Sequence, residues 1–141
     1  MTTVAAARFC MAADTQLTGS GVLHRVTKLF HLSDGGVISG CGDWGRVFAA
    51  IQWAIAGEKG ECPSFEESSL ILMRPDGVIW LADDAWQPYP INDDHAAIGS
   101  GSQGAQVELR RGRTPKQAVE AVVGVDHSTS GLVQVMKVRR K

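Results

Sequence analysis

The chain has 141 residues, of which 44% are hydrophobic and 21% charged, a composition typical of a folded globular domain rather than a disordered segment. Its 14 Lys and Arg residues against 15 Asp and Glu leave a formal net charge of -1, which gives no electrostatic reason to expect a nucleic acid or an anionic membrane as partner. The 16 glycines cluster in a few short loops. We expect one domain over residues 1–141.

The cysteines and histidines give no indication of a bound group. Cys10, Cys41 and Cys62 are an odd number without C-x-x-C spacing, and the four histidines form no H-x-x-x-H pair, so neither a disulfide framework nor a metal site is indicated. No window of 18 apolar residues occurs, and the start lacks the segments of a signal peptide. We therefore expect a cytoplasmic protein without a membrane span, metal or cofactor.

Hairpins account for the first forty residues. Residues 2–7 and 9–13 are small and apolar and predict two strands joined by a tight turn at Arg8, and residues 15–21 are rich in turn formers. Residues 28–32 and 36–39 predict a second hairpin, because an Asp-Gly pair stands between them.

A helix and a third hairpin follow. Apolar residues recur at helical spacing over residues 44–56, and Gly57 is expected to end this helix. Residues 58–67 read as a polar loop. Residues 69–73 and 78–82 flank an Arg-Pro-Asp-Gly turn and predict two more strands.

The last part mixes strands and helices. Residues 83–94 carry two prolines and predict an irregular excursion before a strand at residues 96–98. Helices are expected at residues 103–111 and 114–125, the second opening with a Thr-Pro cap, and a last strand at residues 132–138. The order ββββ-α-ββ-β-αα-β, joined mostly by hairpins, predicts an α+β fold with mainly antiparallel sheets.

Two glycine clusters, at residues 40–45 and 99–104, follow strands and match G-x-G-x-x-G. A dinucleotide site needs in addition a parallel strand that ends in an acid about 20 residues later, and neither cluster is followed by one. What remains is a pair of tight strand-to-helix turns whose backbone N–H groups suit an oxyanion or another small anion. A nucleotide-binding protein is the weakest of the functions considered.

Thr2 is the first chemically notable residue. Methionine before a small residue is normally removed, and a free N-terminal threonine combines a hydroxyl nucleophile with an α-amine of pKa near 8 that can serve as its base. Asp14 closes the second strand of the first hairpin, so antiparallel pairing brings it back beside Thr2. Lys28 opens the next strand and could pair with Asp14.

These features, in order, resemble the proteasome β-subunit and HslV-type peptidase family of N-terminal nucleophile hydrolases. The resemblance covers nearly the whole chain. The start at residues 2–4 looks like the family's mature start, and residues 12–18 are similar to its A-(A/G)-D-x-(R/Q)-x-T segment. Residues 37–43 resemble the strand and turn that supply the family's oxyanion donor. Residues 97–101 are similar to its (A/I)-x-G-S-G segment, and residues 126–131 to its D-x-x-S-G-G segment. In the last segment Thr129 replaces the usual serine and Ser130 the usual glycine.

The resemblance implies a role for each matching residue. Thr2 would be the nucleophile of a threonine-type endopeptidase, with its own α-amine as base, and Lys28, held charged by Asp14, would lower the proton affinity nearby. The Gly40 N–H would stabilise the oxyanion. The amine would be oriented by Ser100, Asp126 and Thr129.

The resemblance also implies a binding surface for a peptide or unfolded-protein substrate. Thr18 would bind the substrate backbone, Gly42 would lie in the binding site, and Ile38 would line the specificity pocket. An apolar preference at the cleaved residue is the expectation that follows from Ile38.

The implied fold is a four-layer α-β-β-α sandwich of two mainly antiparallel sheets. Between Gly57 and Ser68 the family has a second long helix, whereas this chain has room only for a loop, so one helical layer is expected to be reduced. The family further implies a homo-oligomer, a ring, and an ATP-dependent unfoldase as partner. The alternatives are a non-catalytic assembly or interaction module of the same fold and an amidase that acts on a small molecule.

Overall fold

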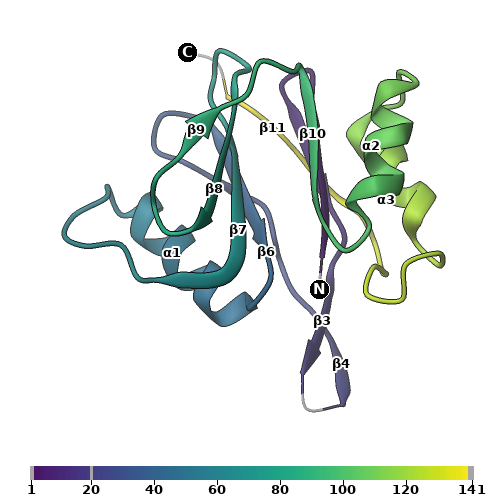
Figure 1. Ribbon diagram of the computed structural model, residues 1–141, viewed down its shortest axis with the longest axis horizontal. Coiled ribbons are helices and arrows are strands. Elements are labelled where there is room, and N and C mark those ends of the chain that lie inside the picture. The colour runs from purple at the N-terminus through teal and green to yellow at the C-terminus, as the bar shows by residue number, and fades with distance from the viewer. Residues whose placement is uncertain (1, 20, 140–141) are drawn as a thin grey trace.

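A computed structural model describes residues 2–19 and 21–139 of the chain, and over these residues it shows an α+β fold (Figure 1). One sheet has four antiparallel strands in the order β10-β1-β2-β11. Their bounds are β1 Thr3–Ala7, β2 Cys10–Ala13, β10 His95–Gly99 and β11 Gln134–Lys137.

The second sheet is antiparallel and has the order β5-β6-β7-β8-β9. Its strands are β5 Phe30–His31, β6 Val37–Cys41, β7 Phe65–Met73, β8 Ile79–Asp84 and β9 Tyr89–Pro90. A separate hairpin of β3 (Gln16–Gly19) and β4 (Val22–Arg25) projects beyond the two sheets (Figure 1).

The helices lie on the outer faces of the two sheets. α1 (Trp44–Ile55) packs on β6 and β7, and α2 (Ser102–Arg110) and α3 (Pro115–Val122) pack on β1 of the other sheet (Figure 1). The layers are therefore α-β-β-α, as the resemblance implies.

Strand alternation explains this layering. In β1, Val4 and Ala6 belong to the apolar cluster between the sheets, whereas Ala5 and Ala7 belong to the cluster beneath α2 and α3. Successive side chains of a strand point to opposite faces, so a strand buried on both sides must be apolar throughout. All five residues of β1 are buried, which places the start of the chain in the middle of the sandwich.

Local signals set the helix ends. The Asp43 side chain accepts a hydrogen bond from the Arg46 N–H at the start of α1. At α3, Thr114 and Gln117 cap each other's backbone N–H groups, with Pro115 in the first turn. Each cap satisfies N–H groups that have no partner within the helix.

Three expectations need correction. β3 lies within the turn-rich residues 15–21, for which the sequence indicates no strand, and it pairs with β4. β7 begins at Phe65, inside the expected loop, because it pairs with Asp84 before a register irregularity that ends at Ser69. The excursion at residues 83–94 contains the short strand β9.

The reduced helical layer is confirmed. Residues 56–64, between α1 and β7, contain no helix, so α1 alone covers the outer face of the five-stranded sheet. None of the helices in the described part of the chain is long and apolar enough to cross a membrane.

Candidate active site

The Thr2 hydroxyl lies at the centre of a buried polar cluster. Lys28 Nζ donates to Thr2 Oγ1 over 2.9 Å and to Asp14 Oδ1 over 3.0 Å. Thr2 is 4% exposed, Lys28 1% and Asp14 0%. Three segments meet here, because Thr2 precedes β1, Asp14 follows β2 and Lys28 precedes β5.

The first hairpin places Asp14. β1 and β2 pair Val4 with Ala13, so Asp14 comes opposite Thr3, and its N–H donates to the Thr3 carbonyl over 3.3 Å. The Thr3 N–H also donates to Asp14 Oδ1 over 3.1 Å. Asp14 Oδ2 accepts from the N–H groups of Gln16 and Ser130 over 3.2 and 3.3 Å. With Lys28, four donors satisfy this buried carboxylate, as a buried charge requires.

Lys28 is held through its backbone as well as its amine. Its N–H donates to Gln134 Oε1 over 2.7 Å, and its carbonyl accepts from Ser39 Oγ over 2.6 Å. Burial lowers the pKa of Lys28 and outweighs the neighbouring Asp14 carboxylate, which raises it. A buried lysine with a lowered pKa against a hydroxyl is suited to stabilising charge on that hydroxyl.

A pocket of about 250 Å³ opens beside Thr2. The residues that line it are Thr2, Cys41, Gly42, Glu67, Ser68, Ser69, Gly99 and Ser100. Burial raises the pKa of the Cys41 thiol to about 11, so this side chain is neutral at physiological pH and is no thiolate nucleophile. Of the nucleophilic side chains in the pocket, Thr2 is the one paired with a buried lysine.

The turn after β10 is shaped around the start of β1. Gly99 has φ +100°, and a Cβ there would lie 1.6 Å from the Thr2 carbonyl oxygen. The Ser100 N–H donates to that carbonyl over 2.9 Å, and the Gly101 N–H donates to Thr3 Oγ1 over 3.1 Å. Glycine is required at residue 99 for both its backbone angle and this close approach.

A chain of hydroxyls continues from Thr3. Thr3 Oγ1 lies 2.6 Å from Thr129 Oγ1, which in turn donates to Asp126 Oδ2. The single Thr129 proton is thus used on Asp126, so Thr3 is the donor to Thr129. Ser100 Oγ also donates to Asp126 Oδ2, over 2.6 Å. Burial raises the pKa of Asp126, but the hydrogen bonds from Ser100 and Thr129 outweigh it and leave that pKa below its usual range.

The structure brings together most of the residues that the sequence singles out. Thr2, Asp14 and Lys28 are in direct contact, and Gly42 and Ser100 line the pocket. Asp126 and Thr129 join the cluster through Ser100 and Thr3. Gly40 lies in β6, directly before the pocket residues Cys41 and Gly42, and a Cβ there would be 2.6 Å from Val47 Cγ1.

Two expected binding residues lie outside this pocket. Ile38 is fully buried in the apolar cluster between the five-stranded sheet and α1 and is not among the residues that line this pocket. Thr18 is exposed on β3, and its hydroxyl accepts from Gln16 Nε2 over 3.0 Å. Because β6 is buried on both faces, the sequence pattern around Ile38 does not show which face of the strand meets the pocket.

Sequence reasoning missed Thr3, Gln134 and Glu67. Hairpin register could have found Thr3, because the same pairing that brings back Asp14 places it opposite Thr3. Gln134 reaches the Lys28 backbone from β11, more than one hundred residues away, and no local signal marks it. Glu67 enters the pocket from a segment that the sequence places in a loop.

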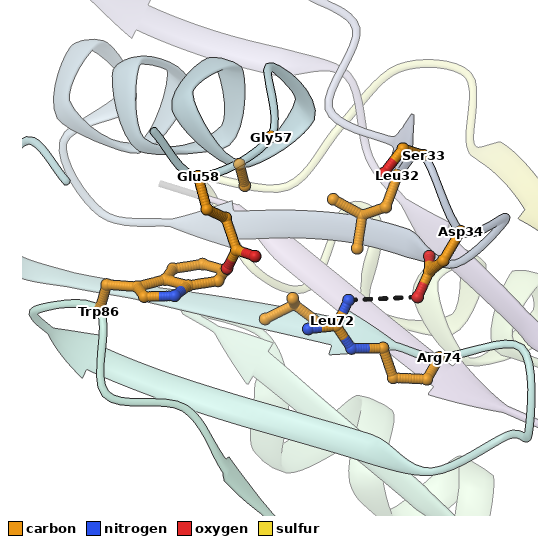
Figure 2. Close-up of a pocket in the computed structure, with 9 residues that line it drawn as sticks. Leu32, Ser33, Asp34, Gly57, Glu58, Leu72, Arg74 and Trp86 are labelled. Carbon is orange, nitrogen blue, oxygen red and sulfur yellow. Dashed lines mark hydrogen bonds and ion pairs between the residues drawn. The ribbon is translucent and has the colours of Figure 1, made fainter. Parts of the chain in front are cut away.

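A second pocket, of about 280 Å³, lies beside the C-terminal end of α1 (Figure 2). In it Glu58 and Trp86 lie across from Asp34 and Arg74, whose ion pair measures 3.3 Å (Figure 2). The side chains of Asp34 and Arg74 are 43% and 33% exposed, so water screens the attraction between them. The buried lysine contact at Thr2 makes the first pocket the candidate active site.

No protein-family model and no curated protein matches the chain by sequence. Solved structures do match it. Eukaryotic HslV from Trypanosoma brucei is 18% identical with a TM-score of 0.71, covering 95% of this chain and 97% of that one. BPH from Thiobacillus denitrificans is 14% identical with a TM-score of 0.64 over 99% of both chains. The Anbu (Gly-1) mutant from Hyphomicrobium sp. strain MC1 is 13% identical with a TM-score of 0.75, covering 99% of this chain and 82% of that one. The resemblance to HslV-type proteins is therefore confirmed for the fold.

Proposed function

We propose that the chain is a threonine-type peptidase or amide hydrolase whose nucleophile is the Thr2 hydroxyl. The observation that carries this proposal is the contact of 2.9 Å between Thr2 Oγ1 and the buried Lys28 amine, itself paired with Asp14, at the edge of a pocket. Removal of Met1, which would free the Thr2 amine, is part of the proposal and lies outside the described residues.

The proposed reaction has two stages. The Thr2 α-amine takes the hydroxyl proton while Oγ bonds to the amide carbon, and the Gly40 N–H stabilises the oxyanion that forms. The amine then passes its proton to the leaving nitrogen as the C–N bond breaks, leaving an ester on Thr2. Water attacks this ester, gives a proton back through the amine to Oγ, and releases the acid product. Lys28 donates to Oγ throughout and stabilises its negative charge.

Ser100, Asp126 and Thr129 act in this proposal as positioning residues. The Ser100 N–H holds the Thr2 carbonyl, and Thr129 holds the Thr3 hydroxyl. The Asp126 carboxylate accepts from the hydroxyls of both Ser100 and Thr129 and so links the two residues. This arrangement fixes the backbone on both sides of the reacting residue, and catalysis depends strongly on such orientation.

The test combines intact-mass analysis with an epoxyketone probe, since BPH has been solved in complex with epoxomicin. We expect a purified protein that begins at Thr2 and gains one probe molecule, and no adduct in Thr2→Ala. Ser64→Ala is the matched control, because that hydroxyl is exposed in the loop after α1 and outside the pocket, and it should be labelled like the wild type. Retention of Met1, or an adduct that persists in Thr2→Ala, would contradict the proposal.

The proposed substrate is a peptide or an unfolded protein in the cytoplasm, with assembly into a homo-oligomeric ring and an ATP-dependent unfoldase as partner. The similarity to HslV supports assembly, as do large apolar side chains left exposed, Leu132 at 87% and Val125 at 78%. Light scattering tests it: a single species with the mass of one chain would contradict the ring.

The missing helix between α1 and β7 favours a second candidate, a non-catalytic assembly module. Such a module would form a defined oligomer, would not react with the probe, and would assemble equally well with Lys28→Ala. A small-molecule amidase would instead react with the probe and cleave no peptide.

A further inference from the structure

Glu67 is the acidic residue among those that line the pocket beside Thr2. It lies at the irregular start of β7, between Phe65 and Ser69, with φ +60°. Its backbone N–H is held by Asp84 Oδ1 over 2.8 Å. Its side chain is exposed, and none of the described residues forms an ion pair with its carboxylate.

The other lining groups are neutral. Four hydroxyls, one thiol and two glycines make up the rest of the wall. Cys41 stays protonated because its pKa is about 11. Among the side chains of the lining residues that the structure describes, Glu67 therefore carries the formal charge, and the Thr2 α-amine freed by removal of Met1 acts as a base in its neutral form. Asp83 adds negative charge nearby, since Ser69 Oγ donates to its Oδ1 over 2.6 Å.

Two basic side chains near the pocket, Lys28 and Arg46, already have partners. Lys28 pairs with Asp14 beneath Thr2. Arg46, in the first turn of α1, lies 3.9 Å from the Asp43 carboxylate and donates to the Glu66 carbonyl over 3.4 Å. A carboxylate in a small pocket without a partner attracts a cation from the ligand, and like charges are repelled there.

We infer that the pocket binds a basic side chain, Lys or Arg, of the residue whose carbonyl Thr2 attacks, and that Glu67 determines this specificity. The inference rests on the proposed function, since it names the substrate class of the same site. It replaces the apolar preference expected from Ile38, which is buried elsewhere. A volume of about 250 Å³ suits one side chain rather than a folded segment.

The first experiment measures turnover with fluorogenic peptides that differ only in the residue before the cleaved amide, Arg, Leu or Glu. We expect kcat/KM for the Arg peptide to exceed that for the Leu peptide by roughly tenfold and the Glu peptide to be cleaved least. Glu67→Gln should abolish the difference between Arg and Leu, and Glu67→Lys should make the Glu peptide the best. Glu66→Gln is the matched control, because Glu66 is also exposed on β7 but does not line the pocket.

The second experiment measures binding without turnover. In the Thr2→Ala protein, N-acetyl-arginine methylamide should bind at least fivefold more tightly than the norleucine analogue, as followed by NMR titration, and Glu67→Gln should remove the difference. Equal binding of the two ligands, or an arginine preference that survives Glu67→Gln in either experiment, overturns the role of Glu67. Basic-selective binding without cleavage of any peptide contradicts the proposed peptidase and leaves the role of Glu67 standing. Cleavage of peptides with Leu preferred over Arg would support the proposed peptidase and contradict the role of Glu67.

Discussion

Two acid–base pairs, one in contact with Thr2 and one in the wall of the second pocket, differ sharply in burial although each joins a basic side chain to an aspartate. Lys28 and Asp14 are almost completely buried, and the Asp14 carboxylate accepts from three backbone N–H groups. Arg74 and Asp34 instead lie partly exposed beside α1 (Figure 2). Burying a charged pair costs several kcal/mol of desolvation per ion, so such a pair is poor evidence of stability for its own sake. The comparison teaches that the costly buried pair is the one that contacts the Thr2 hydroxyl, through Lys28.

The packing around glycine also differs between the region of Thr2 and the end of α1. Gly99 and Gly57 have nearly equal φ values, +100° and +104°. A Cβ at Gly99 would meet the Thr2 carbonyl, whereas a Cβ at Gly57, beside the second pocket, would meet nothing within 4 Å. The backbone is tightly packed around Thr2 and open at the end of α1.

The largest expected effect is that of Asp14→Ala. It removes the partner of buried Lys28 and the acceptor for three backbone N–H groups, so we expect a loss of about 3–5 kcal/mol in the free energy of unfolding. Asp34→Ala in the exposed pair should cost about 1 kcal/mol or less. Urea denaturation measures both, and equal losses would remove the distinction between the two pairs.

The glycine comparison predicts the next largest effect. Gly99→Ala combines backbone strain with a clash at the Thr2 carbonyl and should cost roughly 2–4 kcal/mol. Gly57→Ala adds strain alone and should cost about 1–2 kcal/mol. Thermal unfolding of the two variants checks this. If Gly57→Ala lost as much stability as Gly99→Ala, the backbone angle φ rather than the packing around the glycine would account for the cost.

A smaller effect is expected from acid. The hydrogen bonds from Ser100 and Thr129 lower the pKa of Asp126 below its ordinary value of 3.8 despite its burial. The folded state therefore binds this proton less readily than the unfolded state, and the stability that Asp126 contributes is present above about pH 4. It is lost as the pH falls through the folded-state pKa. Denaturation at pH 2–6 should show a weaker acid dependence in Ser100→Ala, and an unchanged profile would contradict this.

The smallest effect concerns cysteine chemistry. Burial raises the pKa of Cys41 to about 11, so about one thousandth of it is thiolate at pH 8. Cys62 lies in the loop that follows α1 and is less buried, although burial raises its pKa too. Iodoacetamide at pH 8 should therefore modify Cys62 before Cys41, as peptide mapping would show. Faster labelling of Cys41 would mean that the Thr2 pocket is more open than the structure shows.

Much of the fold could be predicted from short-range signals. The Asp-Gly turns, the Thr114 cap and the glycine after α1 locate elements to within a few residues, because they act through the backbone of their own neighbourhood. The hairpin at Arg8 also brings Asp14 to the start of the chain by pairing alone. The buried contact of Thr2 with Lys28 could be anticipated through a family resemblance but not through local pattern.

The sequence by itself thus determined the order of the helices and main strands and the chemical character of Thr2, Asp14 and Lys28. Only the tertiary structure decided which side chains face the pocket. Ile38 is apolar on a strand buried on both faces, so its pattern is the same whichever face meets the pocket, and packing against α1 settles it. Glu67 reaches the pocket because the start of β7 departs from regular register, and such a shift depends on pairing with β8 rather than on neighbours in sequence.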